Sequence, residues 1–360
     1  MNKCSARFRL VFLSYIRYNK LRGDNQMKIG ISFDPYGRTY GRYDEGKFLK
    51  IKQHGYDAVD YNIANTGSEL YSVNEDELKR IVNAEKHAAQ CAGIQISQVH
   101  GPWRWPPQDS SQLQREERLD KMKKSVIIAS LLGCDSLVIH PIMPYGIEDL
   151  KFGKQQETWD INVEFFKSLI DFAKQYSITI CLENMPMRYF SIATPEKILE
   201  LVKEINDDHF KICLDTGHVS VFSELSIGNE IRKLGNYIKV LHIHDNMGDG
   251  DFHLYPTKGI IDWYDFVNAL DEIGYEGVLS LETSPSENLE DDVFEKESID
   301  LCKMFKELIL ANQKRISKSV QRTITEQLVN PCILRVYELF FMSFTLMYFR
   351  FYICSMLLLK

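Results

Sequence analysis

The sequence has no regular spacing of cysteines. Its eight cysteines are scattered, and no two of them form a CxxC pair. Several, such as Cys181 and Cys213, stand inside apolar strand-like runs, where cysteine acts as a small core residue. This distribution argues against a disulfide framework and indicates a reducing compartment, so we expect a cytoplasmic protein.

Several functional motifs and an excess of positive charge are also missing. The chain carries neither a glycine-rich phosphate loop of the P-loop or dinucleotide type nor a GxSxG nucleophile elbow. Its formal charge of −7 argues against a general nucleic-acid binder, which needs a basic surface to displace counterions. The 360 residues are 44% hydrophobic and 26% charged, which is enough for one large domain or two average ones.

The two ends differ from the middle. Residues 1–26 are basic, and their apolar piece is thin for a signal peptide, whereas Met27 opens a strand-like run. We therefore predict an N-terminal extension over 1–26, a catalytic domain over 27–313 and a C-terminal extension over 314–360. The hydrophobic run 339–359 is long enough to span a bilayer, but Arg350 inside it is costly there. A membrane anchor, a docked helix and a non-native tail remain alternatives for this run.

Short strand-like runs alternate with amphipathic helical stretches through the middle of the chain. The strand runs are rich in Val, Ile and Leu on both faces, as buried parallel strands are. Several helical stretches end in a glycine just before the next run, which is typical of a helix C-cap. Eight such units in this length predict an α/β fold, a single (β/α)8 TIM barrel. The predicted strands are 28–33, 57–61, 94–100, 135–140, 178–183, 210–215, 238–245 and 277–282.

Imidazoles and carboxylates stand at the carboxyl ends of six of these predicted strands. In a (β/α)8 barrel these ends converge on one mouth, where active sites are built. A buried ring of carboxylates would repel itself unless a cation neutralised it, and mixed imidazole and carboxylate ligands favour a divalent metal, Mn, Zn or Co, with Mg as a further candidate. The residues are His100, His140, Glu183, Asp215, His242 with His244, and Glu282.

Other histidines and aromatic residues carry weaker signals. His54 and His87 lie in helical patterns with polar neighbours, so we expect both to be solvated. Trp103 and Trp105 follow the strand-end His100 in "VHGPWRWPP". The choice for them lies between core filling and a wall of the substrate site, and we favour the wall.

Five motifs in order give the chain a recognisable pattern. They are "CLENMP", "CLDTGH", "HIHDN", "PTKGIIDW" and "LSLET". Over about residues 28–310 the chain resembles the xylose-isomerase-like TIM barrels, a family of sugar isomerases and epimerases that also includes endonuclease IV. The resemblance implies a divalent-metal-dependent isomerase or epimerase that acts through an enediolate on a small sugar, a sugar phosphate or another sugar derivative.

The resemblance to the sugar epimerases implies roles for individual residues. A single metal would be bound by Glu183, Asp215, His242 and Glu282, and the two glutamates would transfer the proton. His242 is preferred to His244 because the family's histidine precedes an acid by three positions, here Asp245. The residues expected to touch substrate are His218, Trp103, Arg188 and Lys258.

Endonuclease IV offers the main alternative reading, an endonuclease that hydrolyses phosphodiesters at abasic sites. That enzyme binds additional metals, and its further ligands match His100, His140, His218, Asp251 and His253. Two features argue against this reading: the negative net charge of the chain, and the N-terminal segment "GISFDPYG", which lacks the motif usual at that point in endonuclease IV. A non-catalytic barrel tethered to a membrane is a second alternative.

The chain departs from the ketose epimerases at two positions. Those enzymes carry a second glutamate and an arginine where this chain has Tyr189 and Gly248. Free-ketose 3-epimerase activity is therefore in doubt, and Arg188 or Lys258 is expected to bind a different end of the substrate. The sequence leaves open the exact sugar, the number of metals and whether the chain forms a homo-oligomer.

Overall fold

The computed structural model describes the chain except residues 1–26, 41–45, 108, 284, 286–289 and 329–360. Residues 27–309 form one compact unit, and the second unit comprises residues 1–26 and 310–360. The hydrophobic run 339–359 lies outside the described residues. Within the described ranges, no helix has the length and hydropathy needed to cross a membrane.

Eight strands form the centre of the unit. All pairings between adjacent strands are parallel, in the order β7-β6-β5-β4-β3-β2-β1-β8. The sheet closes between β7 and β8, where Ile243 bridges Leu281 and the Ile243 N–H donates to the Ser280 carbonyl at 2.9 Å. The strands are β1 Ile29–Ser32, β2 Ala58–Asn62, β3 Gln95–His100, β4 Ser136–Ile139, β5 Thr179–Glu183, β6 Phe210–Asp215, β7 Ile238–His242 and β8 Leu279–Leu281.

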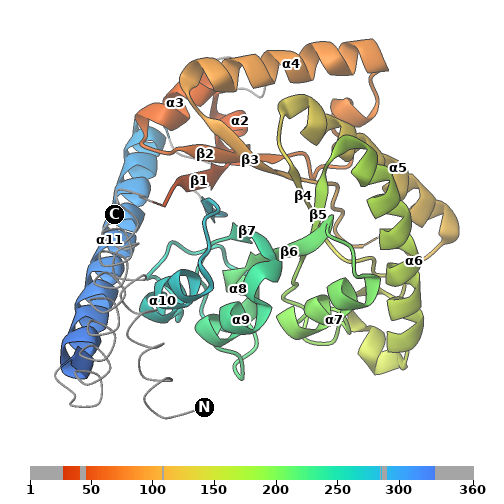
Figure 1. Cartoon of the computed structure of the whole chain (residues 1–360). Helices are drawn as coiled ribbons and strands as arrows, with labels where there is room; N and C mark the ends of the chain where they lie inside the picture. Colours follow the sequence, from red (N-terminus) through yellow and green to blue (C-terminus); the bar gives the residue numbers. More distant parts are fainter. Residues whose placement is uncertain (1–26, 41–45, 108, 284, 286–289, 329–360) are drawn as a thin grey trace, which may run out of the picture. The chain divides into compact units, whose positions relative to one another are not determined.

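Helices connect successive strands and surround the barrel, as Figure 1 shows. This arrangement confirms the predicted single TIM barrel. The α-helices are α2 Asp34–Tyr40, α3 Lys47–Gln53, α4 Glu75–Ala92, α5 Gln112–Leu132, α6 Gln155–Ala173, α7 Pro195–Ile205, α8 Thr216–Ser220, α9 Ile227–Leu234, α10 Trp263–Ile273 and α11 Asp291–Leu328. Short 3₁₀ helices are η1 Glu69–Tyr71, η2 Gly146–Phe152, η3 Lys174–Tyr176 and η4 Gly235–Tyr237.

Local sequence explains where the helices before β3 and β4 begin and end. The Asn74 side chain accepts a hydrogen bond from the Glu77 N–H at the start of α4, and Ser111 and Gln114 form a capping box at the start of α5. Gly93 and Gly133 end these helices in the left-handed conformation with φ of 68° and 78°. The predicted glycine C-caps are therefore confirmed at both positions.

On the side formed by β4 to β7, the barrel interior below the mouth is apolar. Val138, Cys181, Cys213 and Val240 form a buried cluster contributed by β4, β5, β6 and β7. The two cysteines are fully buried and free, as the sequence predicted for core cysteines. Burial raises the pKa of both thiols. This apolar layer lies directly below the polar strand ends of β4 to β7.

Candidate metal centre

The polar side chains predicted at the strand ends meet at one end of the barrel. Four of them end strands β3, β5, β6 and β7, and two follow β4 and β8 directly. The parallel register brings them to one level, since Asp215 pairs with His242 across the β6–β7 ladder. They are His100, Glu183, Asp215 and His242 at strand ends, with His140 and Glu282 one position beyond.

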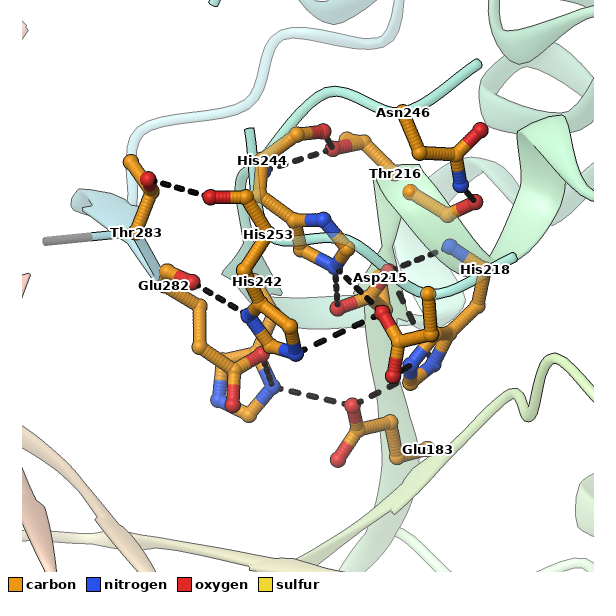
Figure 2. Close-up of polar contacts among 12 residues, drawn as sticks. Glu183, Asp215, Thr216, His218, His242, His244, Asn246, His253, Glu282 and Thr283 are labelled. Carbon is orange, nitrogen blue, oxygen red and sulfur yellow. Dashed lines mark hydrogen bonds and ion pairs between the residues drawn. The ribbon is translucent and has the colours of Figure 1, made fainter. Parts of the chain in front are cut away.

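His242 lies at the centre of the group. Its Nδ1 is 3.0 Å from Glu183 Oε1 and also 3.0 Å from Glu282 Oε2. Its Nε2 is 2.8 Å from Oδ2 of Asp60, a residue of β2. Figure 2 shows the His242 ring between the two glutamates. A single proton on Nδ1 can serve only one of the two carboxylates, so this nitrogen has more acceptors around it than it can satisfy.

Three carboxylate oxygens of this group are not satisfied by hydrogen bonds of good geometry. Among the described residues, Glu183 Oε2, Glu282 Oε2 and Asp60 Oδ1 are buried and make no such bond. Imidazole nitrogens of His140 and His242 lie 3.0 Å from the first two of these oxygens, respectively, but only as ion-pair contacts. A buried carboxylate oxygen without a donor is costly. A divalent cation bound by oxygen and imidazole ligands would satisfy such atoms, so the residues present fit a metal.

The surrounding imidazoles keep both glutamates ionised. Burial raises the pKa of Glu183, but His242, His140 and His100 together hold it well below its usual range. Burial also raises the pKa of Glu282, and His242 and His253 outweigh this and lower it. Both carboxylates therefore carry the charge that a metal ligand or a general base needs near neutral pH.

A second group lies beside the first, around Glu183 Oε2. His140 Nε2 is 3.0 Å from this oxygen, and His100 Nε2 is 3.5 Å from it. The ligand atoms of His100, His140 and Glu183 all lie within 4.8 Å of one another. Burial lowers the pKa of His140 to about 4, so its ring is neutral and keeps a lone pair for a metal.

A third group forms around Asp215 and includes several of the predicted additional ligands. His244 Nε2 is 3.0 Å from Asp215 Oδ2, and the His244 ring stacks on the His253 ring with centroids 4.1 Å apart. Asp251 links His253 to His218. Its Oδ1 lies 3.3 Å from Nε2 of His253, and its Oδ2 lies 3.3 Å from Nε2 of His218. The structure thus brings His218, Asp251 and His253 together, as predicted.

The predicted four-residue ligand set is only partly assembled by direct contacts. Glu183, His242 and Glu282 converge directly, whereas the side chain hydrogen-bonded to Asp215 is His244, at Oδ2. Asp215 approaches the other three through His218, whose Nδ1 is 3.6 Å from both Asp215 Oδ1 and Glu183 Oε1. The assignment of these residues as ligands stays a prediction.

Helix α8 explains why Asp215 and His218 are held together. Asp215 is the N-cap of α8, and its Oδ1 accepts a hydrogen bond of 2.6 Å from the His218 N–H. The His218 Nδ1 donates to the Asn184 carbonyl at 2.7 Å, which leaves Nε2 directed toward Asp251. The "DTGH" motif therefore positions two polar side chains with one turn of helix.

Asp245 organises the loop after β7. Its carboxylate accepts hydrogen bonds from the backbone N–H groups of Thr257 and Ile261 and from the Trp263 indole, the last at 3.1 Å. Gly259 packs so closely against the backbone after β7 that an added Cβ would lie 2.1 Å from the Asn246 carbonyl oxygen. The acid of "HIHDN" and the glycine and tryptophan of "PTKGIIDW" therefore form one structural unit.

The predicted substrate residues lie in different environments. The Trp103 ring packs edge-on against His140, with centroids 4.4 Å apart, so it borders the mouth. The exposed Arg188 donates to the carbonyls of Val221 and Gly248, the latter at 3.1 Å. Lys258 is exposed on the loop that Asp245 organises. Their roles toward substrate stay predictions.

Sequence reasoning missed Asp60 and Gln98 and misjudged His54. Asp60 and Gln98 are polar residues inside buried strand runs, and that pattern was the available signal. His54 was expected to be solvated but is 3% exposed, so that prediction was wrong. Its Nδ1 lies 2.8 Å from the hydroxyl of the buried Tyr36, a long-range contact that local polarity does not reveal. His87 is exposed, as predicted.

Comparisons with known proteins match this architecture. The family model "Xylose isomerase-like TIM barrel" matches residues 48–302. A D-psicose 3-epimerase of Ruminiclostridium cellulolyticum is 26% identical over 262 residues, which cover 71% of this chain and 83% of that protein. The solved structure of IOLI protein with a zinc atom has a TM-score of 0.63 at 20% identity, covering 79% of this chain and 98% of that one.

A probable endonuclease 4 of Metamycoplasma arthritidis is also similar. It is 31% identical over 148 residues, but these cover only 37% of this chain and 50% of that protein. The similarity to the psicose epimerase extends over a larger part of both chains.

Proposed function

Because this chain belongs to the xylose isomerase-like TIM barrel family, we propose that it is a divalent-metal-dependent isomerase or epimerase of a sugar or sugar derivative. The observation that carries the proposal is the placement of two ionised carboxylates, Glu183 and Glu282, 3.0 Å from the same nitrogen of His242. The similarity to a D-psicose 3-epimerase over most of both chains supports it.

The metal would be bound by Glu183, Asp215, His242 and Glu282. Mn²⁺, Zn²⁺, Co²⁺ and Mg²⁺ are the candidates, because the donors are carboxylates and an imidazole. Such an ion would supply positive charge next to the substrate carbonyl, where negative charge develops when the neighbouring carbon loses its proton.

Glu183 and Glu282 are the proposed proton-transfer pair. They extend from β5 and from the end of β8, so they approach the centre of the mouth from different strands. One carboxylate removes the proton beside the carbonyl, and the other returns a proton to the enediolate. Since histidines lower the pKa of both, both start as bases. His218 would orient a substrate hydroxyl from the Asp215 side, and Trp103 would form a wall.

The distal end of the substrate is proposed to differ from that of the ketose epimerases. The exposed Tyr189 and the glycine Gly248 replace the glutamate and arginine of those enzymes. Arg188 reaches the Gly248 carbonyl, so its guanidinium lies beside the position where those enzymes carry their arginine. Arg188, and Lys258 on the neighbouring loop, would bind a polar or anionic end of the substrate.

A phosphodiester hydrolase is the second candidate. The observation in its favour is the additional group His100, His140 and Glu183, whose ligand atoms lie within 4.8 Å of one another. Several clustered metals would generate hydroxide and stabilise a leaving oxygen. A hydrolase would bind two or three metals per chain, whereas the proposed isomerase needs one.

Solvent exchange separates the two chemistries. The metal-loaded protein is incubated in heavy water with a panel of ketoses, aldoses and their phosphates. We expect deuterium at the carbon next to the carbonyl of the active compound, because the enediolate exchanges that proton with solvent. Cleavage of a duplex with an abasic site, with no deuterium in any sugar, would reject the isomerase and favour the hydrolase.

A further inference from the structure

Asp60 connects the second strand to the metal centre across the barrel interior. It lies in β2, is 2% exposed, and its Oδ2 is 2.8 Å from Nε2 of His242, 182 residues further along the chain. A carboxylate accepts hydrogen bonds, so this contact places a hydrogen on Nε2. Nδ1, which lies 3.0 Å from Glu183 Oε1 and from Glu282 Oε2, is then the nitrogen that can release its proton and offer a lone pair to a metal.

Gln98 holds Asp60 in this orientation. The two residues pair in the β2–β3 ladder, and Gln98 Nε2 donates to Asp60 Oδ2 at 3.1 Å. The same nitrogen donates to the Leu241 carbonyl of β7 at 3.3 Å. Gln98 therefore ties the carboxylate both to its own side of the barrel and to the strand that carries His242.

Asp60 is poorly explained as a purely structural residue. Its second oxygen, Oδ1, is buried and has no hydrogen-bond partner among the described residues. A buried carboxylate with an unsatisfied oxygen costs stability that an apolar side chain would avoid. The cost is understandable if the charge serves the neighbouring imidazole, because a carboxylate on the second nitrogen fixes the tautomer of a metal-binding histidine and raises its basicity.

We propose that Asp60 is a positioning residue that fixes His242 with Nε2 protonated and Nδ1 as the metal ligand. This inference rests on the proposed metal-dependent function. Asp60 acts through His242 and does not itself touch metal or substrate. Gln98 acts one step further out by orienting Asp60.

The tautomer of His242 gives the first test and needs no variant of Asp60. The full chain is labelled with ¹⁵N-histidine and loaded with Zn²⁺, and the ring nitrogens are observed by NMR, with His242→Asn identifying the signals. We expect a protonated Nε2 and a zinc-bound Nδ1. The opposite pattern, with zinc on Nε2, overturns the proposal.

Zinc affinity in two variants gives the second test. Asp60→Ala should weaken zinc binding by about 10- to 100-fold, the usual effect of losing such a hydrogen bond. Asp60→Asn keeps an accepting oxygen without the charge and should recover part of the loss. Asp57→Asn is the matched control, because Asp57 directly precedes β2, lies at the opposite end of that strand and contacts the Ile29 N–H. It should leave zinc affinity unchanged.

The outcomes separate this proposal from the proposed function. A wild-type protein that binds no divalent metal overturns both. A wild-type protein that binds zinc and labels its substrate, while Asp60→Ala binds zinc equally well, overturns only the role of Asp60.

Discussion

Two buried charged clusters in this barrel have opposite bonding patterns. Between α3 and α4, the fully buried Lys47 lies 2.7 Å from Glu85 Oε1, and the Tyr61 hydroxyl donates to Glu85 Oε2 at 3.4 Å. The Lys47 ammonium also lies 5.2 Å and 5.1 Å from the centroids of two phenylalanine rings. Here each buried charge has a partner of opposite sign, and both carboxylate oxygens of Glu85 have a hydrogen-bond donor.

The mouth cluster, defined as Asp60, Glu183, His242 and Glu282, shows the reverse. Three carboxylates crowd around one imidazole, and within the described ranges each has one buried oxygen that makes no hydrogen bond of good geometry. The difference indicates which cluster serves the fold and which serves a ligand. A satisfied pair needs nothing further, whereas unsatisfied oxygens around one point need a cation.

The largest expected effect is on catalysis, at the mouth. Glu183→Gln and Glu282→Gln keep the shape of the side chain and remove its basicity, so each should lower turnover by about 10²- to 10⁴-fold. Turnover is measured on the substrate found by the deuterium screen, with metal content determined in the same samples. If either variant turns over substrate normally while it retains its metal, that glutamate is not a catalytic base and the mouth cluster does not have the proposed role.

Lys47 should matter for folding instead. Lys47→Met leaves Glu85 as an unpaired buried charge, which should lower the free energy of unfolding by about 3–5 kcal/mol. Urea unfolding measures this, and metal affinity should not change. The double variant Lys47→Met with Glu85→Leu should recover most of the loss, because two apolar residues replace the pair. A double variant as unstable as the single one would contradict this reading of the pair.

Stability should respond to pH in the metal-free protein. Burial lowers the pKa of His218, but Asp215 and Asp251 outweigh burial and raise this pKa to about 10. Burial also lowers the pKa of His253, but Asp251 and Glu282 outweigh it and raise this pKa to about 10. A pKa raised in the folded state gives stability that is complete below the unfolded value of 6.5 and is lost as pH rises toward about 10.

Metal binding should follow the opposite trend as pH rises, because a metal must displace the proton on Nδ1 of His242. Burial lowers the pKa of this imidazole, but Cys213, Glu282 and Glu183 outweigh burial and raise it well above its usual value. The melting temperature of the metal-free protein should therefore fall from pH 6.5 to 10, while the increase caused by added Zn²⁺ grows. Thermal melts at matched ionic strength measure both. A metal-induced increase that shrinks as pH rises would contradict the account.

The smallest effect is expected at the rim. Arg188→Ala removes a proposed contact to the distal end of the substrate, so KM should rise by about tenfold with kcat and metal affinity little changed. Steady-state kinetics check this. Lys124→Ala on α5 is a suitable control for the loss of a cation outside the mouth, because the half-buried Lys124 ammonium donates to the carbonyls of Tyr71 and Val73. A fall in kcat with unchanged KM in Arg188→Ala would place Arg188 in the chemistry itself.

The strands were predictable because each is a short apolar run between helical patterns. Strand β6 has the predicted bounds, 210–215. The predicted seventh strand, 238–245, continues past the real end of β7 at His242. The apolar alternation extends further, but the backbone of Asp245 pairs with Leu254 in an antiparallel bridge and turns the chain away. The pattern of residues does not contain that pairing.

The candidate site was predictable where residues stand at strand ends and less so elsewhere. His100, Glu183 and Glu282 were found from position alone, because the barrel brings strand ends together. Asp60 and Gln98 were missed because they lie one layer below the mouth, inside strands. The contact between Asp215 and His244 was also missed. His242 and His244 are two positions apart and point to the same face of the chain, so the sequence pattern does not tell which of them contacts Asp215.

Counting metal ions per chain tests the central claim most directly. The account predicts that the wild-type protein binds one divalent ion per chain by titration and elemental analysis. It also predicts that Glu282→Ala and Asp215→Ala each bind it at least about tenfold more weakly, since even losses outside the ligand set cost that much. Full metal content in both variants would contradict the proposed site. Two or three ions in the wild type would contradict the isomerase and favour the hydrolase.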